Sequence, residues 1–115
     1  MSVVDRNVID IISIEGDESS KRIVLYISDH VNWDLETIGG HLSILQDKIN
    51  DYLDFITSDQ ISEHYSKDQY RFIKIMILFS YPLPSDAVVF LNQAKEIIQE
   101  AGYELDWKFD PEHSD

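Results

Sequence analysis

The sequence of 115 residues contains no cysteine. A disulfide framework, a thiolate metal site and a cysteine nucleophile are therefore excluded. Glycine and proline are scarce, and no glycine-rich phosphate loop or H-E-x-x-H zinc motif occurs. The longest uninterrupted apolar run, Ile75–Phe79, is far too short to cross a bilayer. The first residues lack a basic segment followed by a long apolar run, so we expect no signal peptide and a cytoplasmic location.

Basic residues are also few: nine Lys and Arg stand against 22 Asp and Glu, which gives a formal net charge of −13. A field of this sign repels phosphate backbones and anionic lipid, so we expect neither a nucleic acid nor a membrane as partner. The same field speeds encounter with a basic protein. Acidity of this size also serves simply to keep a cytosolic domain soluble, and both interpretations remain open at this stage.

The length and the 43% hydrophobic content are those of one globular domain with a core of its own. We assign residues 1–110 to a single α/β domain. The last five residues, 111–115, read P-E-H-S-D, and we expect them to form a disordered acidic tail.

The central feature is the segment Tyr70–Tyr81, which is apolar on both faces of a strand. Such a strand normally lies in the interior of a sheet. Two earlier β-rich segments, Val8–Ile14 and Arg22–Ser28, are joined by the turn E-G-D-E-S-S and predict a hairpin. A last strand, Tyr103–Phe109, alternates strictly between apolar and polar residues, so one of its faces should be buried.

Two segments have helical periodicity. In the first, Asn32 and Asp34 are N-cap candidates, and Gly39-Gly40 is the weak point, so the helix either bends there or begins at His41. Its apolar stripe should comprise Leu35, Ile38, Leu42, Leu45, Ile49, Leu53 and Ile56. The second helix should be capped by Ser85 and stopped by Gly102, with an apolar stripe of Ala87, Phe90, Leu91, Ala94, Ile97, Ile98 and Ala101.

The order of elements is therefore β-β-α-β-α-β. The short links around the second helix predict a parallel βαβ unit, and the hairpin adds an antiparallel pair. We predict an α+β fold, a two-layer α/β sandwich, in which a four-stranded mixed sheet carries both helices on one face.

This arrangement leaves apolar side chains on the uncovered face of the sheet. A patch of this kind often marks an interaction surface, so we predict a homodimer or a partner interface there. Alternatively, the N-terminal segment or the loop Thr57–Gln69 folds over the same face. The predicted interface residues are Val24, Tyr26, Phe72, Met76 and Leu78.

The best cluster of polar residues follows the second strand. It contains Asp29 and His30, with Trp33 and Asp34 close behind and His41 about two turns further on. Carboxylates beside imidazoles can bind a metal or a ligand, or exchange protons. The alternative is that both aspartates cap or turn the chain and Trp33 fills the edge of the core. We treat the five as candidate binding residues and assign no catalytic residue, metal ligand or cofactor.

Several segments together resemble a known family. They are I-S-D-H-V-N-W-D at 27–34, the helix L-S-I-L-Q-D-K-I-N-D-Y-L-D-F-I, and Y-P-L-P, A-K-E-I-I and A-G-Y-E-L near the end. The chain is similar to a group of small uncharacterised bacterial domains with an I-S-D-H-x-x-W segment. The resemblance covers most of the chain and implies a stand-alone cytoplasmic domain. The group has no established activity, so no catalytic residue is carried over.

Two functions remain. The first is a non-catalytic acidic module that binds a basic protein through its sheet face or an acidic helix face. The second is a small metal-dependent or acid–base enzyme centred on Asp29, His30 and Asp34. We favour binding, because the sequence offers few residues for catalysis.

Overall fold

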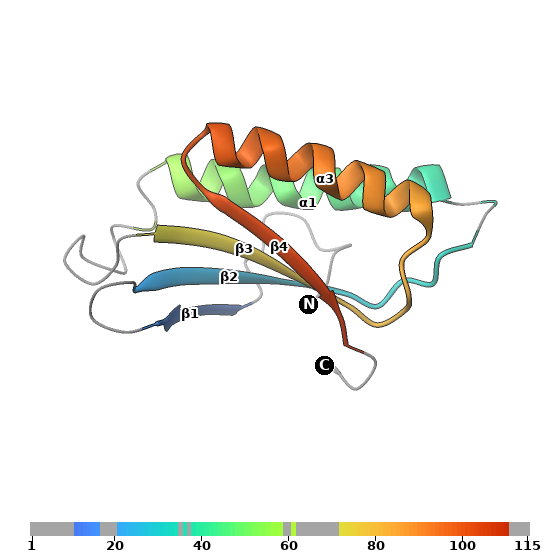
Figure 1. Ribbon diagram of the computed structural model, residues 1–115, viewed down its shortest axis with the longest axis horizontal. Coiled ribbons are helices and arrows are strands. Elements are labelled where there is room, and N and C mark those ends of the chain that lie inside the picture. The colour runs from blue at the N-terminus through green and yellow to red at the C-terminus, as the bar shows by residue number, and fades with distance from the viewer. Residues whose placement is uncertain are drawn as a thin grey trace.

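The computed structural model describes residues 11–16, 21–34, 36, 38–58, 61 and 72–110, which form one sheet and two helices (Figure 1). The expected tail at 111–115, the first residues of the predicted hairpin and nearly all of the segment Thr57–Gln69 lie outside this range. The elements in chain order are β1 (Ile11–Glu15), β2 (Arg22–Asp29), α1 (Ile38–Thr57), β3 (Phe72–Phe79), α3 (Ser85–Glu100) and β4 (Glu104–Phe109).

The four strands lie in the order β1-β2-β3-β4. β1 pairs with β2 antiparallel, whereas β2 with β3 and β3 with β4 are parallel pairs. α1 and α3 lie side by side on the same face of the sheet (Figure 1). The predicted α+β class, the mixed sheet and the order of elements are therefore confirmed. β3 is interior, as the apolar residues on both of its faces indicate.

The core lies between the sheet and the helices. Alternate residues of β2 and β3 point into it, since successive side chains of a strand face opposite sides. Tyr52 of α1 is fully buried and donates a hydrogen bond of 2.5 Å to the main-chain carbonyl of Tyr26, which ties the helix to β2. The fully buried apolar residues of the sheet include Ile23, Leu25, Ile27, Ile75, Ile77, Phe79 and Leu105, and Leu45, Leu91 and Ile98 are among those that meet them from the helices.

The start of α1 differs from the prediction. The helix begins at Ile38, so neither Asn32 nor Asp34 is its N-cap. Instead, the Asp34 side chain accepts a hydrogen bond of 3.0 Å from the backbone N–H of Glu36, a local turn that aspartate commonly forms. Gly39 and Gly40 fall in the first turn.

The buried face of α1 also differs from the predicted stripe. It includes His41 and Lys48, which a stripe chosen by apolar residue type leaves out, while Leu42 and Leu53 are only half-buried. The periodicity is that of a helix, but the face in contact with the sheet is rotated toward these polar residues.

The prediction that Ser85 caps α3 was wrong. The N-cap is Pro84, whose extended backbone (φ −72°, ψ 163°) presents its carbonyl to the first turn without any side-chain cap. The fixed φ of proline suits this position. At the other end, Gly102 has φ 94°, the left-handed conformation predicted for the C-terminal stop. Ile97 of the predicted stripe is 66% exposed, and Ala101 is exposed too.

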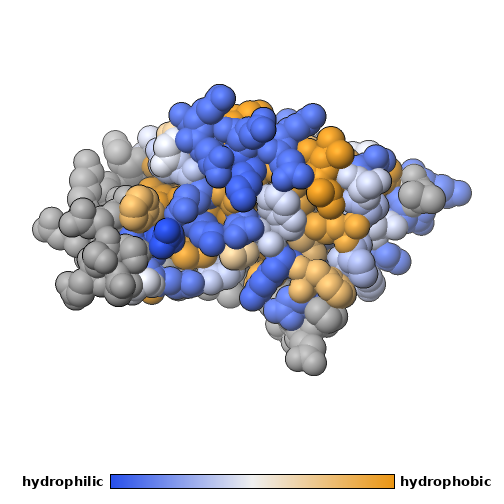
Figure 2. Space-filling view, in the orientation of Figure 1, coloured by the Kyte–Doolittle hydropathy of each residue, from blue (hydrophilic) through white to orange (hydrophobic). Residues whose placement is uncertain are grey.

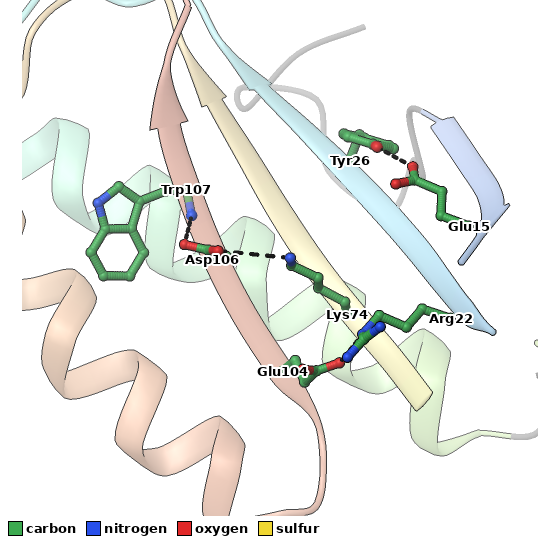
Figure 3. Close-up of polar contacts among 7 residues, drawn as sticks. All are labelled: Glu15, Arg22, Tyr26, Lys74, Glu104, Asp106 and Trp107. Carbon is green, nitrogen blue, oxygen red and sulfur yellow. Dashed lines mark hydrogen bonds and ion pairs between the residues drawn. The ribbon is translucent and has the colours of Figure 1, made fainter. Parts of the chain in front are cut away.

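The face of the sheet opposite the helices carries ion pairs (Figure 3). The Arg22 Nε atom lies 2.8 Å from Glu104 Oε1, a contact that crosses β3, and Lys74 Nζ lies 3.7 Å from Asp106 Oδ2. The Arg22 guanidinium also lies over the Phe72 ring, 5.1 Å from its centroid. Opposite charges on this face therefore compensate one another.

All five predicted interface residues lie on this face, as the register Tyr26↔Met76 and Arg22↔Phe72 requires. Their exposure differs. Val24 is 3% exposed and Leu78 is 8% exposed, so both are already buried within a single chain. Tyr26 and Met76 are half-buried, and only Phe72 is exposed. The apolar area left for a partner is therefore smaller than the sequence pattern indicates.

Gly40→Ala should stabilise the protein by up to about 1 kcal/mol, because alanine restricts the unfolded chain and favours the helix. A Cβ atom at Gly40 meets no atom within 4 Å. Gly102→Ala is the matched control, since its Cβ also meets open space but its φ is +94°. It should destabilise by about 1 kcal/mol. Urea denaturation measures both, and equal shifts for the two variants would contradict the account.

Candidate functional site

The candidate site lies at the carboxyl ends of the parallel strands β2 and β3. Asp29, the last residue of β2, is 1% exposed. Its Oδ1 accepts a hydrogen bond of 3.0 Å from the backbone N–H of Val31, which turns the chain away from the sheet. Its main-chain carbonyl accepts another, also of 3.0 Å, from the N–H of Ser80 after β3. The residue therefore joins the ends of both strands.

The second oxygen of this carboxylate meets an imidazole from the helix. Asp29 Oδ2 lies 2.6 Å from His41 Nε2, and the two side chains are 0% and 3% exposed. An ionised carboxylate can only accept a hydrogen bond, so with Asp29 ionised the proton of this bond lies on Nε2. The pair fixes the first turn of α1 against the end of β2.

Trp33 covers this pair. Its ring stacks on that of His41, with centroids 3.6 Å apart and an angle of 18° between the planes. It also lies beside Phe79, the last residue of β3, at 6.0 Å between centroids. Within the described part of the chain, Trp33 Nε1 and His41 Nδ1 are buried nitrogens without a hydrogen-bond partner.

The remaining two candidates, His30 and Asp34, have other partners. His30 Nδ1 is 2.8 Å from Ser80 Oγ, so the second imidazole binds a hydroxyl. Asp34 is exposed and serves the local turn with Glu36. The structure thus brings Asp29, Trp33 and His41 into one cluster, with His30 beside it, and leaves Asp34 at the surface.

The chemistry open to this cluster is limited. A carboxylate that orients an imidazole is part of many acid–base sites, but there the second ring nitrogen faces the substrate. Here that nitrogen, His41 Nδ1, is buried. The Asp29 carboxylate contacts His41, whereas the Ser80 hydroxyl contacts His30. The carboxylate, an imidazole and the hydroxyl therefore do not form one connected triad. Over the residues that the structure describes, no three His, Asp or Glu side chains are grouped to hold a metal ion.

Two residues near the core were missed by the sequence analysis. Lys48 is 0% exposed, with Nζ 5.5 Å from the Tyr52 ring centroid, and Ser80 binds His30. Lysine is rarely buried, and serine is common at strand ends. Nothing in the sequence therefore indicates that Lys48 is buried or that Ser80 contacts His30.

A second candidate site is the groove between α1 and α3. Its volume is about 290 Å³. Three carboxamides line it, from Gln46 and Asn50 on α1 and from Gln93 on α3. The rest of the lining is apolar and comprises Ile49, Leu53, Phe90, Ala94, Ile97 and Ile98.

Comparison with known proteins places the chain in a family. Residues 1–111 match DUF6572, a family of unknown function. The chain belongs to this family. The resemblance to a small family without established function is thereby confirmed. Neither the curated proteins nor the solved structures gave a match. Within the described segments, no helix has the length and apolar character needed to cross a membrane.

His41→Ala should destabilise the protein by about 3–5 kcal/mol, because it leaves the buried Asp29 carboxylate without its partner. His30→Ala is the control, since it removes a half-buried hydrogen bond and should cost about 1 kcal/mol. The free energy of unfolding in urea tests both. Equal losses would show that the buried pair is not the tie described above.

Proposed function

We propose that this member of DUF6572 is a non-catalytic, cytoplasmic interaction module that binds a basic protein through the outer side of its helix layer. The observation that supports it is the charge on the two helices. α1 carries Asp47, Asp51 and Asp54, and α3 carries Asp86, Glu96 and Glu100.

Neither of the two lysines on these helices is directed to the outer side. Lys48 is 0% exposed and faces the core. Lys95 Nζ lies 5.8 Å from the centroid of the Trp107 ring, so it is directed toward β4. Figure 2 shows hydrophilic side chains gathered over the helix layer, with apolar side chains exposed beside them. An acidic surface of this kind attracts a basic partner and speeds its encounter.

The sheet face is a weaker candidate for an electrostatic interface. There Arg22 pairs with Glu104 and Lys74 pairs with Asp106 (Figure 3). Because these charges are already matched within the chain, the sheet face offers little net negative charge to a basic partner. Of the two surfaces considered from the sequence, the helix side therefore has the stronger support.

The enzymatic alternative has one observation in its favour, the Asp29–His41 contact of 2.6 Å. The other two residues of the predicted catalytic centre give no further support to an enzyme, because Asp34 is exposed and His30 bonds to Ser80. An acid–base role needs the imidazole to reach a substrate, and the His41 side chain is 3% exposed beneath Trp33.

Capture of a basic protein from a lysate should depend on the helix carboxylates. The double variant Glu96→Gln/Glu100→Gln should capture about tenfold less partner than the wild type. The reason is that the electrostatic attraction of a basic protein weakens when two negative charges are removed from the helix surface. The sheet-face variant Glu104→Gln/Asp106→Asn changes the net charge by the same amount and should capture normally. The bound fraction is measured by quantitative mass spectrometry at low and at high salt. Retention that is insensitive to salt, or equal loss in both variants, would refute the proposal.

The sheet face keeps a separate prediction, homodimerisation. If Tyr26, Phe72 and Met76 pack against a second copy, the wild type should have the mass of a dimer, and Met76→Glu should give a monomer because it places a charge in the interface. Light scattering after size exclusion measures both masses. A monomeric wild type, or a Met76→Glu variant that stays dimeric, excludes this interface.

A further inference from the structure

We infer that the groove between α1 and α3 binds a basic amphipathic helix of the partner, with that helix's apolar side chains in the groove and its Lys or Arg residues at the C-terminal ends of α1 and α3. This inference rests on the proposed function and specifies which partner segment is bound, where and in which orientation.

The groove has exposed apolar surface to offer. Ile97, which lines it, is 66% exposed, so most of its side chain is open to a partner. Phe90 and Ala94 on the same helix and Leu53 on α1 are half-buried. Removing such apolar surface from water against a partner favours binding.

The shape of the groove favours a helix over an extended peptide. Its walls run from Gln46 to Leu53 on α1 and from Phe90 to Ile98 on α3, about two helical turns each. The backbone groups of both walls are already bonded within their own helices, so they cannot pair with an extended chain. A helix satisfies its own backbone and can lay an apolar stripe between two others.

Charge gives the orientation. α1 and α3 both run from the carboxyl ends of the strands back to their amino ends, so their C-termini lie at the same end of the molecule (Figure 1). Neither helix has a basic residue in its last turn. The negative ends of two helix dipoles therefore meet there without a compensating cation from these turns.

Carboxylates add to this negative end. Asp54 follows Asn50 by four residues, and Glu100 follows Ile97 by three, so each shares a helix face with a residue of the groove. Both are exposed. Cations of a bound helix placed at this end would meet two carboxylates and two helix termini together, which fixes the direction in which the segment lies.

The test uses a panel of 15-residue synthetic peptides and the isotopically labelled protein. The test peptides have leucines three and four residues apart on one helix face and a cluster of Lys or Arg at one end, placed at the N-terminus in some peptides and at the C-terminus in others. One control peptide has the same composition in scrambled order, and a second has the same leucine stripe with Glu in place of the basic residues. Affinities come from fluorescence anisotropy, and the binding surface from amide chemical-shift changes.

We expect at least one amphipathic basic peptide to bind about tenfold more tightly than both controls. Its shift changes should lie along residues 46–54 and 90–100. Ile97→Gln should weaken it about fivefold at every salt concentration, whereas Val89→Gln, an exposed α3 residue that does not line the groove, should change it less than twofold. Glu96→Gln/Glu100→Gln should weaken it mainly at low salt.

Other outcomes overturn the inference. Equal binding of the scrambled peptide would mean attraction by charge alone, which leaves the proposed function standing but removes the groove from it. Shift changes confined to β4 would indicate an added strand in place of a helix. Failure of every basic peptide would exclude this occupant, while the capture experiment decides separately whether a basic protein binds at all.

Discussion

The rest of the structure follows from one constraint: β3 is apolar on both faces, and the two helices that the structure describes both cover the same face. Flanking strands on each side satisfy its backbone, and α1 with α3 bury Ile75 and Ile77. Both crossover helices lie on the same side, and the opposite face combines apolar with charged side chains. It is crossed by ion pairs from Arg22 and Lys74. Among the residues that the structure describes, none forms a further layer over the outer side of the helix pair.

The Asp29–His41 pair gives the two layers a fixed connection. The Asp29 carboxylate accepts a hydrogen bond at the turn after β2 and contacts His41 in the first turn of α1. The Trp33 ring stacks on the His41 imidazole. A buried pair of this kind adds little net stability over an apolar replacement, but it is costly to break and specifies one geometry. Because both side chains are buried, the pair is a structural tie between the end of β2 and the first turn of α1.

Those outer surfaces differ in the way their charges are arranged. On the sheet face, Arg22 of β2 and Lys74 of β3 pair with two carboxylates of β4, and their fields cancel over a short distance. On the helix side, carboxylates border a groove with exposed apolar side chains. Apolar surface next to charge of one sign can supply both affinity and selection of a partner, because burial stabilises the complex and charge rejects acidic competitors.

The sequence by itself determined the order of the elements, the interior position of β3 and the left-handed stop at Gly102. Each depends on local periodicity or on the backbone freedom of one residue. It also singled out Asp29, His30, Trp33, Asp34 and His41, since all five lie within one short segment. Only the tertiary structure decided that Asp29, Trp33 and His41 meet while Asp34 stays at the surface, because those contacts depend on where α1 begins relative to the end of β2. Likewise, only packing could show that Lys48 is buried and Ile97 exposed: residue type predicts the reverse, and the rotation of each helix on the sheet overrides it.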